Sequence, residues 1–220
     1  MQQFDPTVIT HNLPQIASGF GITLGTWVAG VAIGVAVGFL ISIVQLVGPR
    51  WLRAILRAYI ELLRGTPFLL QLFLLYYGGP SLGITLGPLT AGTLGLGIYA
   101  SAYFAEIFRT GFRSIPPGHV EAAACLGLTR WQTIVRIQVP QMLVLIAPAL
   151  TNMVIVLSKE TAVLSIVTVP ELTFVLTAIG SATFAFVETL LALSVCYLVL
   201  VELASRAGMW AESRVARFLA

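Results

Sequence analysis

The sequence predicts an all-α integral membrane protein with five transmembrane helices. Hydrophobic residues make up 58% of the 220 residues and charged residues only 10%, whereas soluble domains average about 25% charged residues. The mean hydropathy is +0.95. Long uncharged runs alternate with clusters of arginine, and each run can supply the ~20 residues that cross a ~30 Å hydrocarbon core. This balance excludes an ordinary soluble domain.

The first uncharged run extends from residue 12 to residue 49 and predicts one span. Gly30, Gly34 and Gly38 recur within it at every fourth position, as do Gly21 and Gly25. Small residues at this spacing let helix backbones approach closely, so we expect this span to pack against a neighbouring helix. The alternative is that glycine is simply frequent in membrane helices.

Four further spans are predicted at residues 59–77, 89–108, 139–158 and 184–203. The region 161–183 is also apolar, but Pro170 and Glu171 divide it into pieces too short to cross a bilayer. We expect short helices or a re-entrant turn there, on the outer side. Such structure is tolerated in a membrane only where it is buried in protein or lines a cavity.

Arginines cluster after the first, third and fifth spans and are absent from the N-terminal residues and from the loop after the second span. Because basic residues mark the cytoplasmic ends of spans, the N-terminus is expected outside and the C-terminus in the cytoplasm. The chain then divides into an extracytoplasmic leader (1–18), a transmembrane domain (19–210) and a cytoplasmic tail (211–220).

The segment between the third and fourth spans, residues 114–140, is polar enough to lie in water. Pro117, preceded by another proline, suits the first turn of a helix, where a missing N–H would have no partner. Gly127 can adopt the left-handed conformation that ends a helix. Thr129 and Gln132 have the spacing of a capping box, which satisfies free amides at a helix start. The pattern predicts two short helices hinged at Gly127.

Charged residues inside spans are candidate functional residues, because each costs about 2.5 kcal/mol or more at the bilayer centre. Glu61 and Arg64 lie three residues apart on one helix face and are expected to pair with each other. Pro67 removes the hydrogen bond to the Leu63 carbonyl, so the helix is expected to break there. Broken helices commonly expose backbone groups at transporter substrate sites. A structural ion pair near the cytoplasmic interface would explain the same residues, and both interpretations stay open.

Lys159 and Glu160 close the fourth span, and the plain interpretation is that they snorkel to the outer interface. Asn152 lies two turns deeper, where it either lines a pathway or bonds between helices. Glu106 is expected to pair with Arg109, three residues further along the third span.

The segment 114–140 resembles the EAA loop of bacterial ABC importer permeases, whose pattern is E-A-A, three residues, G, nine residues, then I-x-L-P. The matching residues are Glu121, Ala122, Ala123, Gly127, Ile137, Val139 and Pro140, with Val139 where leucine is usual. The resemblance implies that this coupling-helix hairpin docks into an ATP-binding subunit and transmits its closure to the spans. Gly127 would provide the bend and Glu121 a polar contact, while the alanines let a partner's groove approach closely.

Other motifs are similar to those of polar amino-acid permeases of the histidine/glutamine type. The run Glu61 to Pro67 with Gln71 matches E-x-x-R-G-T-P-x-x-x-Q, and Lys159-Glu160-Thr161 is similar to K-D-T-S-L, with Ala162 in place of serine. The resemblance covers residues 19–210 and implies a type I ABC importer permease fold. It makes the following residues candidates for a substrate pathway: Glu61, Arg64, Gly65, Thr66, Pro67, Gln71, Asn152, Lys159 and Glu160.

The function implied is the permease subunit of an ATP-driven importer in the bacterial inner membrane. It would form the pathway for a polar amino acid delivered by a solute-binding protein. A dimer of ATP-binding subunits and a second permease, either the same chain or a paralogue, are the expected partners within the lipid bilayer, and no nucleic acid is expected.

The sequence holds no Walker sequence, no H-E-x-x-H, no G-x-S-x-G and no Cys/His cluster. We therefore expect no enzymatic activity, no cofactor and no metal in this chain, with ATP hydrolysis on a separate subunit. A permease for a related small solute such as an opine is the alternative within the same architecture. A stand-alone channel or an intramembrane enzyme is a more distant alternative.

Overall fold

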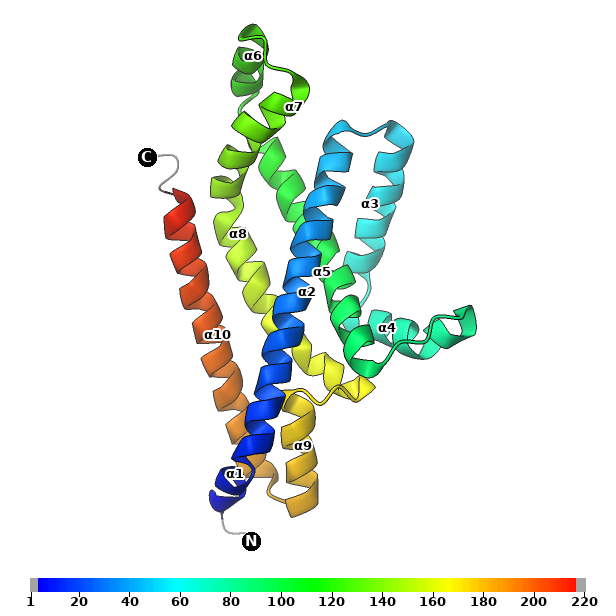
Figure 1. Cartoon of the computed structure of the whole chain (residues 1–220), viewed down its shortest axis with the longest axis vertical. Helices are drawn as coiled ribbons and strands as arrows, with labels where there is room; N and C mark the ends of the chain where they lie inside the picture. The colour runs from blue at the N-terminus through cyan, green and yellow to red at the C-terminus, as the bar shows by residue number, and fades with distance from the viewer. Residues whose placement is uncertain (1–3, 217–220) are drawn as a thin grey trace.

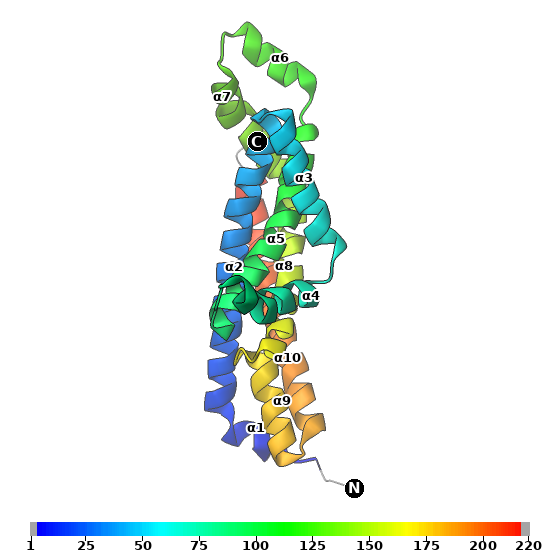
Figure 2. The same cartoon turned by 90° about the vertical axis from the view of Figure 1, so that its right-hand side faces the viewer.

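The computed structural model describes residues 4–216, which form an elongated bundle of helices (Figures 1 and 2). Its long members are α2 (Leu13–Val47), α5 (Pro88–Arg113), α8 (Val139–Glu160) and α10 (Phe186–Ala216). One end of the bundle carries the loop with α6 (Pro117–Cys125) and α7 (Arg130–Thr133). The other end carries α1 (Thr7–His11) and α9 (Leu172–Thr183). Residues 1–3 of the predicted leader and 217–220 of the predicted tail lie outside the described residues.

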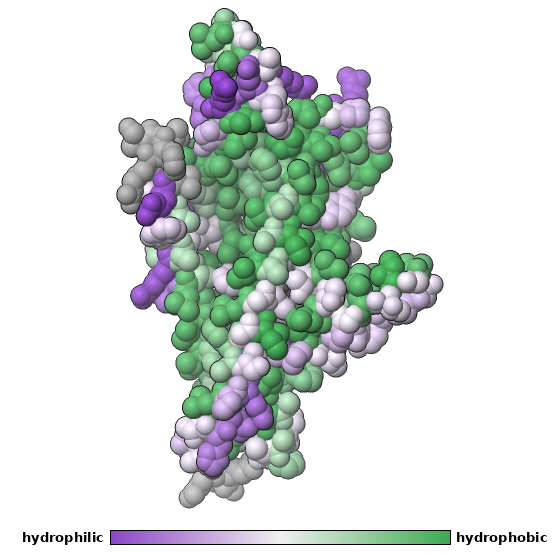
Figure 3. Space-filling model, in the orientation of Figure 1, coloured by the Kyte–Doolittle hydropathy of each residue, from purple (hydrophilic) through white to green (hydrophobic). Residues whose placement is uncertain are grey.

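Three helices of the described chain are long and apolar enough to cross a membrane: Leu13–Val47, Arg130–Val167 and Phe186–Arg214. A fourth span results if α3 (Arg50–Gly65) and the helical segment Phe68–Leu82, which begins with α4, are counted together as one bent span. α5 has 26 residues, about 39 Å of helix, but its charged C-terminal turns and its glycines make it less apolar. Figure 3 shows a broad hydrophobic surface over the middle of the bundle, with hydrophilic residues gathered toward its two ends.

The close packing predicted for the first span is confirmed between α2 and α5. A Cβ added at Gly38 would lie 2.8 Å from the backbone nitrogen of Ala105, and one added at Gly30 would lie 2.8 Å from a side chain of α5. By contrast, a Cβ added at Gly21 or at Gly25 would meet no atom of another helix within 4 Å. The glycine repeat therefore marks a helix contact only in its second half.

The predicted second span, residues 59–77, is not one straight helix. α3 (Arg50–Gly65) ends at the predicted break, and the chain turns through 108° before α4 (Phe68–Phe73). A π-helical turn and a 3₁₀ turn continue α4 as far as Leu82. The break was expected at Pro67, but the size of the bend was not.

The short helices expected between the last two spans are confirmed: η4 (Thr161–Val167) and α9. Glu171 is fully buried and caps α9, because its carboxylate accepts hydrogen bonds from the amides of Thr173 (2.9 Å) and Phe174 (2.7 Å). Burial raises the pKa of the Glu171 carboxyl above its ordinary value, and the amide hydrogen bonds oppose that shift. The cap therefore fixes where α9 begins.

Both predicted domain boundaries fall inside helices. α2 already begins at Leu13, so the last part of the predicted leader is helical, and α10 continues to Ala216, past the predicted start of the tail at residue 211. The leader is held to the bundle, because the amide of Asp5 donates a 2.8 Å hydrogen bond to Glu188 near the start of α10.

Candidate functional site

The loop between α5 and α8 ends its first helix with the predicted glycine. α6 (Pro117–Cys125) stops before Gly127, whose φ of 73° lies in the left-handed region. The Gly127 amide donates to the Ala124 carbonyl at 3.0 Å, and the Leu128 amide donates to the Ala123 carbonyl at 3.1 Å. This pair of bonds is a Schellman motif, which satisfies carbonyls left free at the helix end.

The predicted capping box starts the next helix, α7 (Arg130–Thr133). The Thr129 amide donates to Gln132 Oε1 at 2.8 Å, and the Gln132 amide donates to Thr129 Oγ1 at 3.3 Å. Each residue thus satisfies a free amide of the other.

The second helix of the predicted hairpin is not a separate short helix, and that expectation is wrong. α7 continues through a π-helical turn, η3 (Ile134–Gln138), directly into α8, so that the chain is helical without a break from Arg130 to Glu160. Thr133 and its neighbours have helical backbone angles, and nothing in this stretch breaks the chain as Gly127 does. The part of the loop after Gly127 therefore belongs to the same helix as a candidate span.

The outer surface of the loop combines charge with uncovered apolar side chains. Glu121 and Ala122 are exposed, whereas Ala123 is buried against the loop's interior. Leu126 is 81% exposed and Trp131 is 61% exposed. We call Glu121, Leu126 and Trp131 the loop tip. The sequence motifs do not include the two apolar members, although apolar residues beside a helix-ending glycine in a polar segment are a usable signal.

Two side-chain contacts tie the loop to the bundle. Arg130 donates a 2.9 Å hydrogen bond to the carbonyl of Leu46, at the C-terminal end of α2. His119 of α6 lies 2.7 Å from Oε1 of Gln141 in α8. A cation beside the C-terminal carbonyls of a helix is also favoured by the helix dipole.

The α3–α4 break is held together by Gln71. Its Nε2 lies 2.7 Å from the carbonyl of Leu63, the group that Pro67 leaves without a helical partner. The same nitrogen lies 3.1 Å from the Thr66 carbonyl and 2.9 Å from the Thr66 hydroxyl. Gln71 Oε1 is buried and has no hydrogen-bond partner in the described chain. The side chain therefore satisfies the backbone at the bend and keeps one acceptor free.

The predicted pair of Glu61 with Arg64 does not form. Arg64 instead lies 3.9 Å from Glu106 of α5, and its guanidinium lies 5.4 Å from the centre of the Tyr103 ring. The predicted pair of Glu106 with Arg109 is confirmed, with a 2.8 Å hydrogen bond from Nε to Oε2. The bend after Gly65 turns α3 so that Arg64 reaches a neighbouring helix, which spacing within one helix cannot reveal.

A line of polar and aromatic groups follows α5 from this cluster. The Tyr99 hydroxyl donates to the Tyr103 hydroxyl at 3.2 Å, and the centres of the two rings lie 4.9 Å apart. We call Arg64, Glu106, Tyr103 and Tyr99 the polar strip. The side chain of Glu160, at the end of α8, makes no hydrogen bond or ion pair with the described residues.

The remaining pathway candidates are less engaged. Asn152 and Lys159 are exposed on α8, and neither side chain makes a hydrogen bond or an ion pair with residues 4–216. Gly65, Thr66 and Pro67 form the break itself. Within the described residues no group of three or more His, Cys, Asp or Glu side chains is arranged to hold a metal ion.

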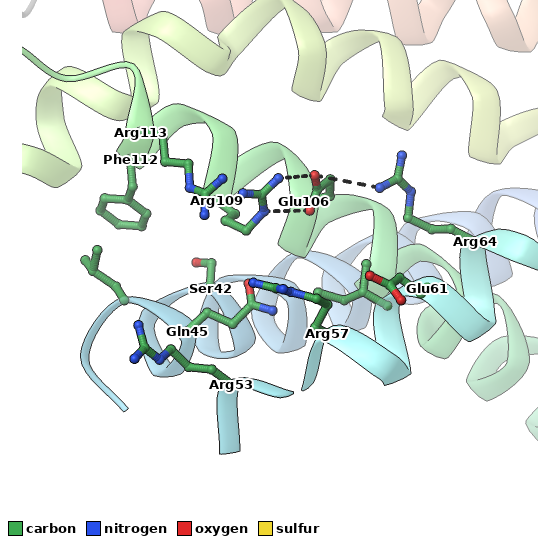
Figure 4. A pocket seen from close by; sticks show the side chains of 12 residues that line it. Ser42, Gln45, Arg53, Arg57, Glu61, Arg64, Glu106, Arg109, Phe112 and Arg113 are labelled. Carbon is green, nitrogen blue, oxygen red and sulfur yellow. Dashed lines mark hydrogen bonds and ion pairs between the residues drawn. The ribbon is translucent and has the colours of Figure 1, made fainter. Parts of the chain in front are cut away.

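A cavity of about 500 Å³ opens between α2, α3 and α5, at the end of the bundle that carries the loop (Figures 1 and 4). We call it the charged cavity. Figure 4 shows Glu106 bridging Arg109 and Arg64 along one wall. The charged residues that line it are Arg53, Arg57, Glu61, Arg64, Glu106, Arg109 and Arg113.

Comparison with known proteins identifies the family. The model of the family described as "binding-protein-dependent transport system inner membrane component" matches residues 21–217. The chain is 32% identical over 202 residues to the probable amino-acid ABC transporter permease protein YckA of Bacillus subtilis, covering 92% of this chain and 89% of that protein. It is 30% identical to the octopine transport system permease protein OccM of Rhizobium radiobacter, with 96% and 92% covered.

The fold agrees with this assignment. A crystal structure of an amino acid ABC transporter with histidines matches with a TM-score of 0.89 at 33% identity, covering 97% of this chain and 100% of that chain. The chain therefore belongs to the family of inner membrane components of binding-protein-dependent transport systems.

Proposed function

We propose that this chain is the permease subunit of an ATP-driven importer for a polar amino acid. We further propose that the loop between α5 and α8 couples the permease to the ATP-binding subunit. The observation that carries the proposal is the loop, in which the E-A-A…G signature lies on a helix closed by a Schellman motif. Related proteins named as amino-acid transporter permeases cover nearly the whole chain, which supports the substrate class.

The loop tip is the surface that we assign to an ATP-binding subunit. Leu126 and Trp131 expose large apolar groups in a segment that faces water, beside the carboxylate of Glu121. Apolar anchors with one charged neighbour are typical of a docking surface. Because α7 and α8 form one continuous helix, a push on Trp131 would move a candidate spanning helix without an intervening hinge, whereas a push on Glu121 or Leu126 would act through Gly127.

The polar strip is our candidate for the wall of the substrate pathway. A zwitterionic amino acid needs a cation for its carboxylate and an acceptor for its ammonium group, and Arg64 and Glu106 supply these at one end of the strip, with Glu160 at the end of α8 as a further candidate acceptor. Tyr99 and Tyr103 line the interval with hydroxyl groups. Gln71 keeps a free acceptor, and Asn152 and Lys159 remain candidates on the neighbouring face of α8.

Five spans follow if the bent pair α3–α4 and helix α5 both cross the bilayer, with α9 re-entrant between the last two. The arginine clusters then place the loop tip and the C-terminus in the cytoplasm and the N-terminus outside. A single bundle of this size encloses little, so a second permease subunit would complete the pathway. A solute-binding protein would deliver the substrate on the outer side.

An opine is the second candidate substrate, because a relative named for octopine transport covers almost the whole chain. Uptake of radiolabelled glutamine, histidine and octopine by the reconstituted importer, with its binding protein, distinguishes a polar amino acid from an opine as the substrate.

Docking is tested by co-purification of the ATP-binding subunit with Leu126→Asp and Trp131→Asp variants. We expect both to lose the ATPase while still inserting into the membrane. Leu82→Asp is the matched control, since Leu82 is 79% exposed but lies outside the loop. Retention of the ATPase by both loop variants would refute the assignment of the tip.

A further inference from the structure

The charged cavity holds more positive charge than its own carboxylates neutralise. Five arginines and two glutamates line it, and Glu106 engages Arg64 and Arg109. No ion pair is found for Arg53, Arg57 or Arg113 within residues 4–216. Unpaired guanidinium groups facing one cavity repel one another unless an anion lies between them.

The helix that supplies Arg53 and Arg57 is amphipathic. These two arginines are four residues apart and face the cavity, whereas Trp51 is 65% exposed and Ile55 is 57% exposed away from it. A helix with arginine on one face and tryptophan and aliphatic residues on the other is typical of the membrane–water interface. α3 begins at Arg50, just after the spanning helix α2 ends, so it lies where lipid headgroups are expected.

A neutral group of the cavity also lacks a partner. Gln45 projects from α2 into the wall of the cavity (Figure 4), and its Oε1 is buried without a hydrogen bond in the described chain. A buried acceptor of this kind costs about 1–3 kcal/mol unless a donor reaches it. A ligand that carries a hydroxyl group beside its negative charge would supply that donor.

We propose that the charged cavity binds the headgroup of an anionic membrane lipid that carries hydroxyl groups next to its phosphate, as phosphatidylglycerol does. Arg53 and Arg57 bind the phosphate oxygens, for which the planar guanidinium group is well suited. Gln45 accepts a hydrogen bond from the headgroup hydroxyl. The volume of about 500 Å³ is in the range of small-molecule sites. A lipid is favoured over free phosphate because α3 carries arginines on the face toward the cavity and exposed apolar residues on its other face, the pattern of a helix at the membrane–water interface.

The bound lipid would hold α3 against α2 and α5 by its headgroup, while its acyl chains remain in the bilayer. This role differs from transport, since Arg53 and Arg57 lie outside the polar strip. The inference requires that the chain spans a membrane, which its family establishes, and it does not depend on the identity of the substrate.

The test compares the purified importer complex in nanodiscs of phosphatidylcholine with and without phosphatidylglycerol. Native mass spectrometry measures the retained phosphatidylglycerol for the parent, the double variant Arg53→Gln/Arg57→Gln, and the matched control Arg50→Gln on the same helix outside the cavity. General attraction to an anionic lipid surface contributes about a fivefold gain in affinity per arginine, so we expect the Arg50→Gln control to lose no more than about fivefold and the double variant to lose more than the roughly thirtyfold that two such arginines give. A loss of about thirtyfold or less in the double variant would show only unspecific attraction and overturn the proposal.

Two further measurements separate the remaining explanations. Gln45→Met removes the acceptor while keeping the side-chain length, and we expect it to abolish the preference for phosphatidylglycerol over phosphatidic acid, which lacks headgroup hydroxyls. Inorganic phosphate added to the complex in detergent should not raise its thermal midpoint, and a rise equal to that with phosphatidylglycerol would assign the cavity to free phosphate. If the double variant instead changes substrate uptake equally with and without phosphatidylglycerol, the cavity belongs to the substrate pathway and the proposal fails.

Discussion

Replacing Gly127 with alanine tests whether the left-handed hinge determines the geometry of the loop. An added Cβ at Gly127 meets no atom within 4 Å, so the substitution creates no clash with the rest of the protein. The whole cost comes from the φ of 73°, which penalises an L-residue by roughly 1–2 kcal/mol. Gly118 in α6 also has no neighbour within 4 Å, but it has ordinary helical geometry. Gly118→Ala is therefore a control matched in size and position.

The assay measures hydrogen exchange of the backbone amides at positions 127 and 128 in the purified complex. Both amides donate the hydrogen bonds of the Schellman motif. A strain of roughly 1–2 kcal/mol predicts about 5- to 30-fold faster exchange in Gly127→Ala. Gly127→Asn should show a smaller effect, because asparagine tolerates this conformation better, and Gly118→Ala should show none. Equal exchange in Gly127→Ala and Gly118→Ala would refute the claim that backbone conformation at the hinge fixes the loop.

Three other substitutions probe the bundle by thermal unfolding in detergent. Gly38→Ala should destabilise the protein by about 1–3 kcal/mol by forcing α2 and α5 apart, whereas Gly25→Ala, with open space around it, should be neutral or stabilising. Gln71→Leu should cost about 1–3 kcal/mol because it leaves the carbonyls at the α3–α4 break unpaired, and an unchanged midpoint would show that the break needs no cap. Glu106→Gln should lower the midpoint by more than Glu202→Gln, whose exposed ion pair contributes less than about 1 kcal/mol.

The features of the loop that the sequence predicted correctly are those with local causes. The left-handed Gly127 and the capping box of Thr129 and Gln132 depend on residues within one or two turns of one another. The Glu106–Arg109 pair is local in the same way, since its members are three residues apart on one helix. The packing at Gly38 was also predictable, although the identity of its partner, α5, was not.

The features that the sequence did not predict depend on where separate helices lie. Glu61 and Arg64 have good spacing for a pair, but the pairing of Arg64 is decided by α5, whose Glu106 already holds another arginine. The charged cavity arises from three helices and is invisible in any one of them. The continuity of α7 with α8 was missed because the fourth span was predicted to begin at residue 139, whereas a π-helical turn joins the two helices just before Pro140.

These connections define which parts of the bundle can move when the loop is pushed. α2 and α5 are locked together where Gly38 meets the α5 backbone, so they form one body. The helix that begins at Arg130 packs on both of them: Trp27 of α2 donates to the Val154 carbonyl at 2.9 Å, and at the end that carries the loop Arg130 donates to the Leu46 carbonyl. The hinge at Gly127 has free space around it, whereas the bond from Arg130 must break before this end of the helix can move away from α2. If the loop couples the permease to an ATP-binding subunit as proposed, this bond lies on the coupling route, and we expect Arg130→Gln to raise ATP hydrolysis in the absence of substrate while leaving docking at the loop tip intact. Unchanged basal hydrolysis would place the coupling route elsewhere.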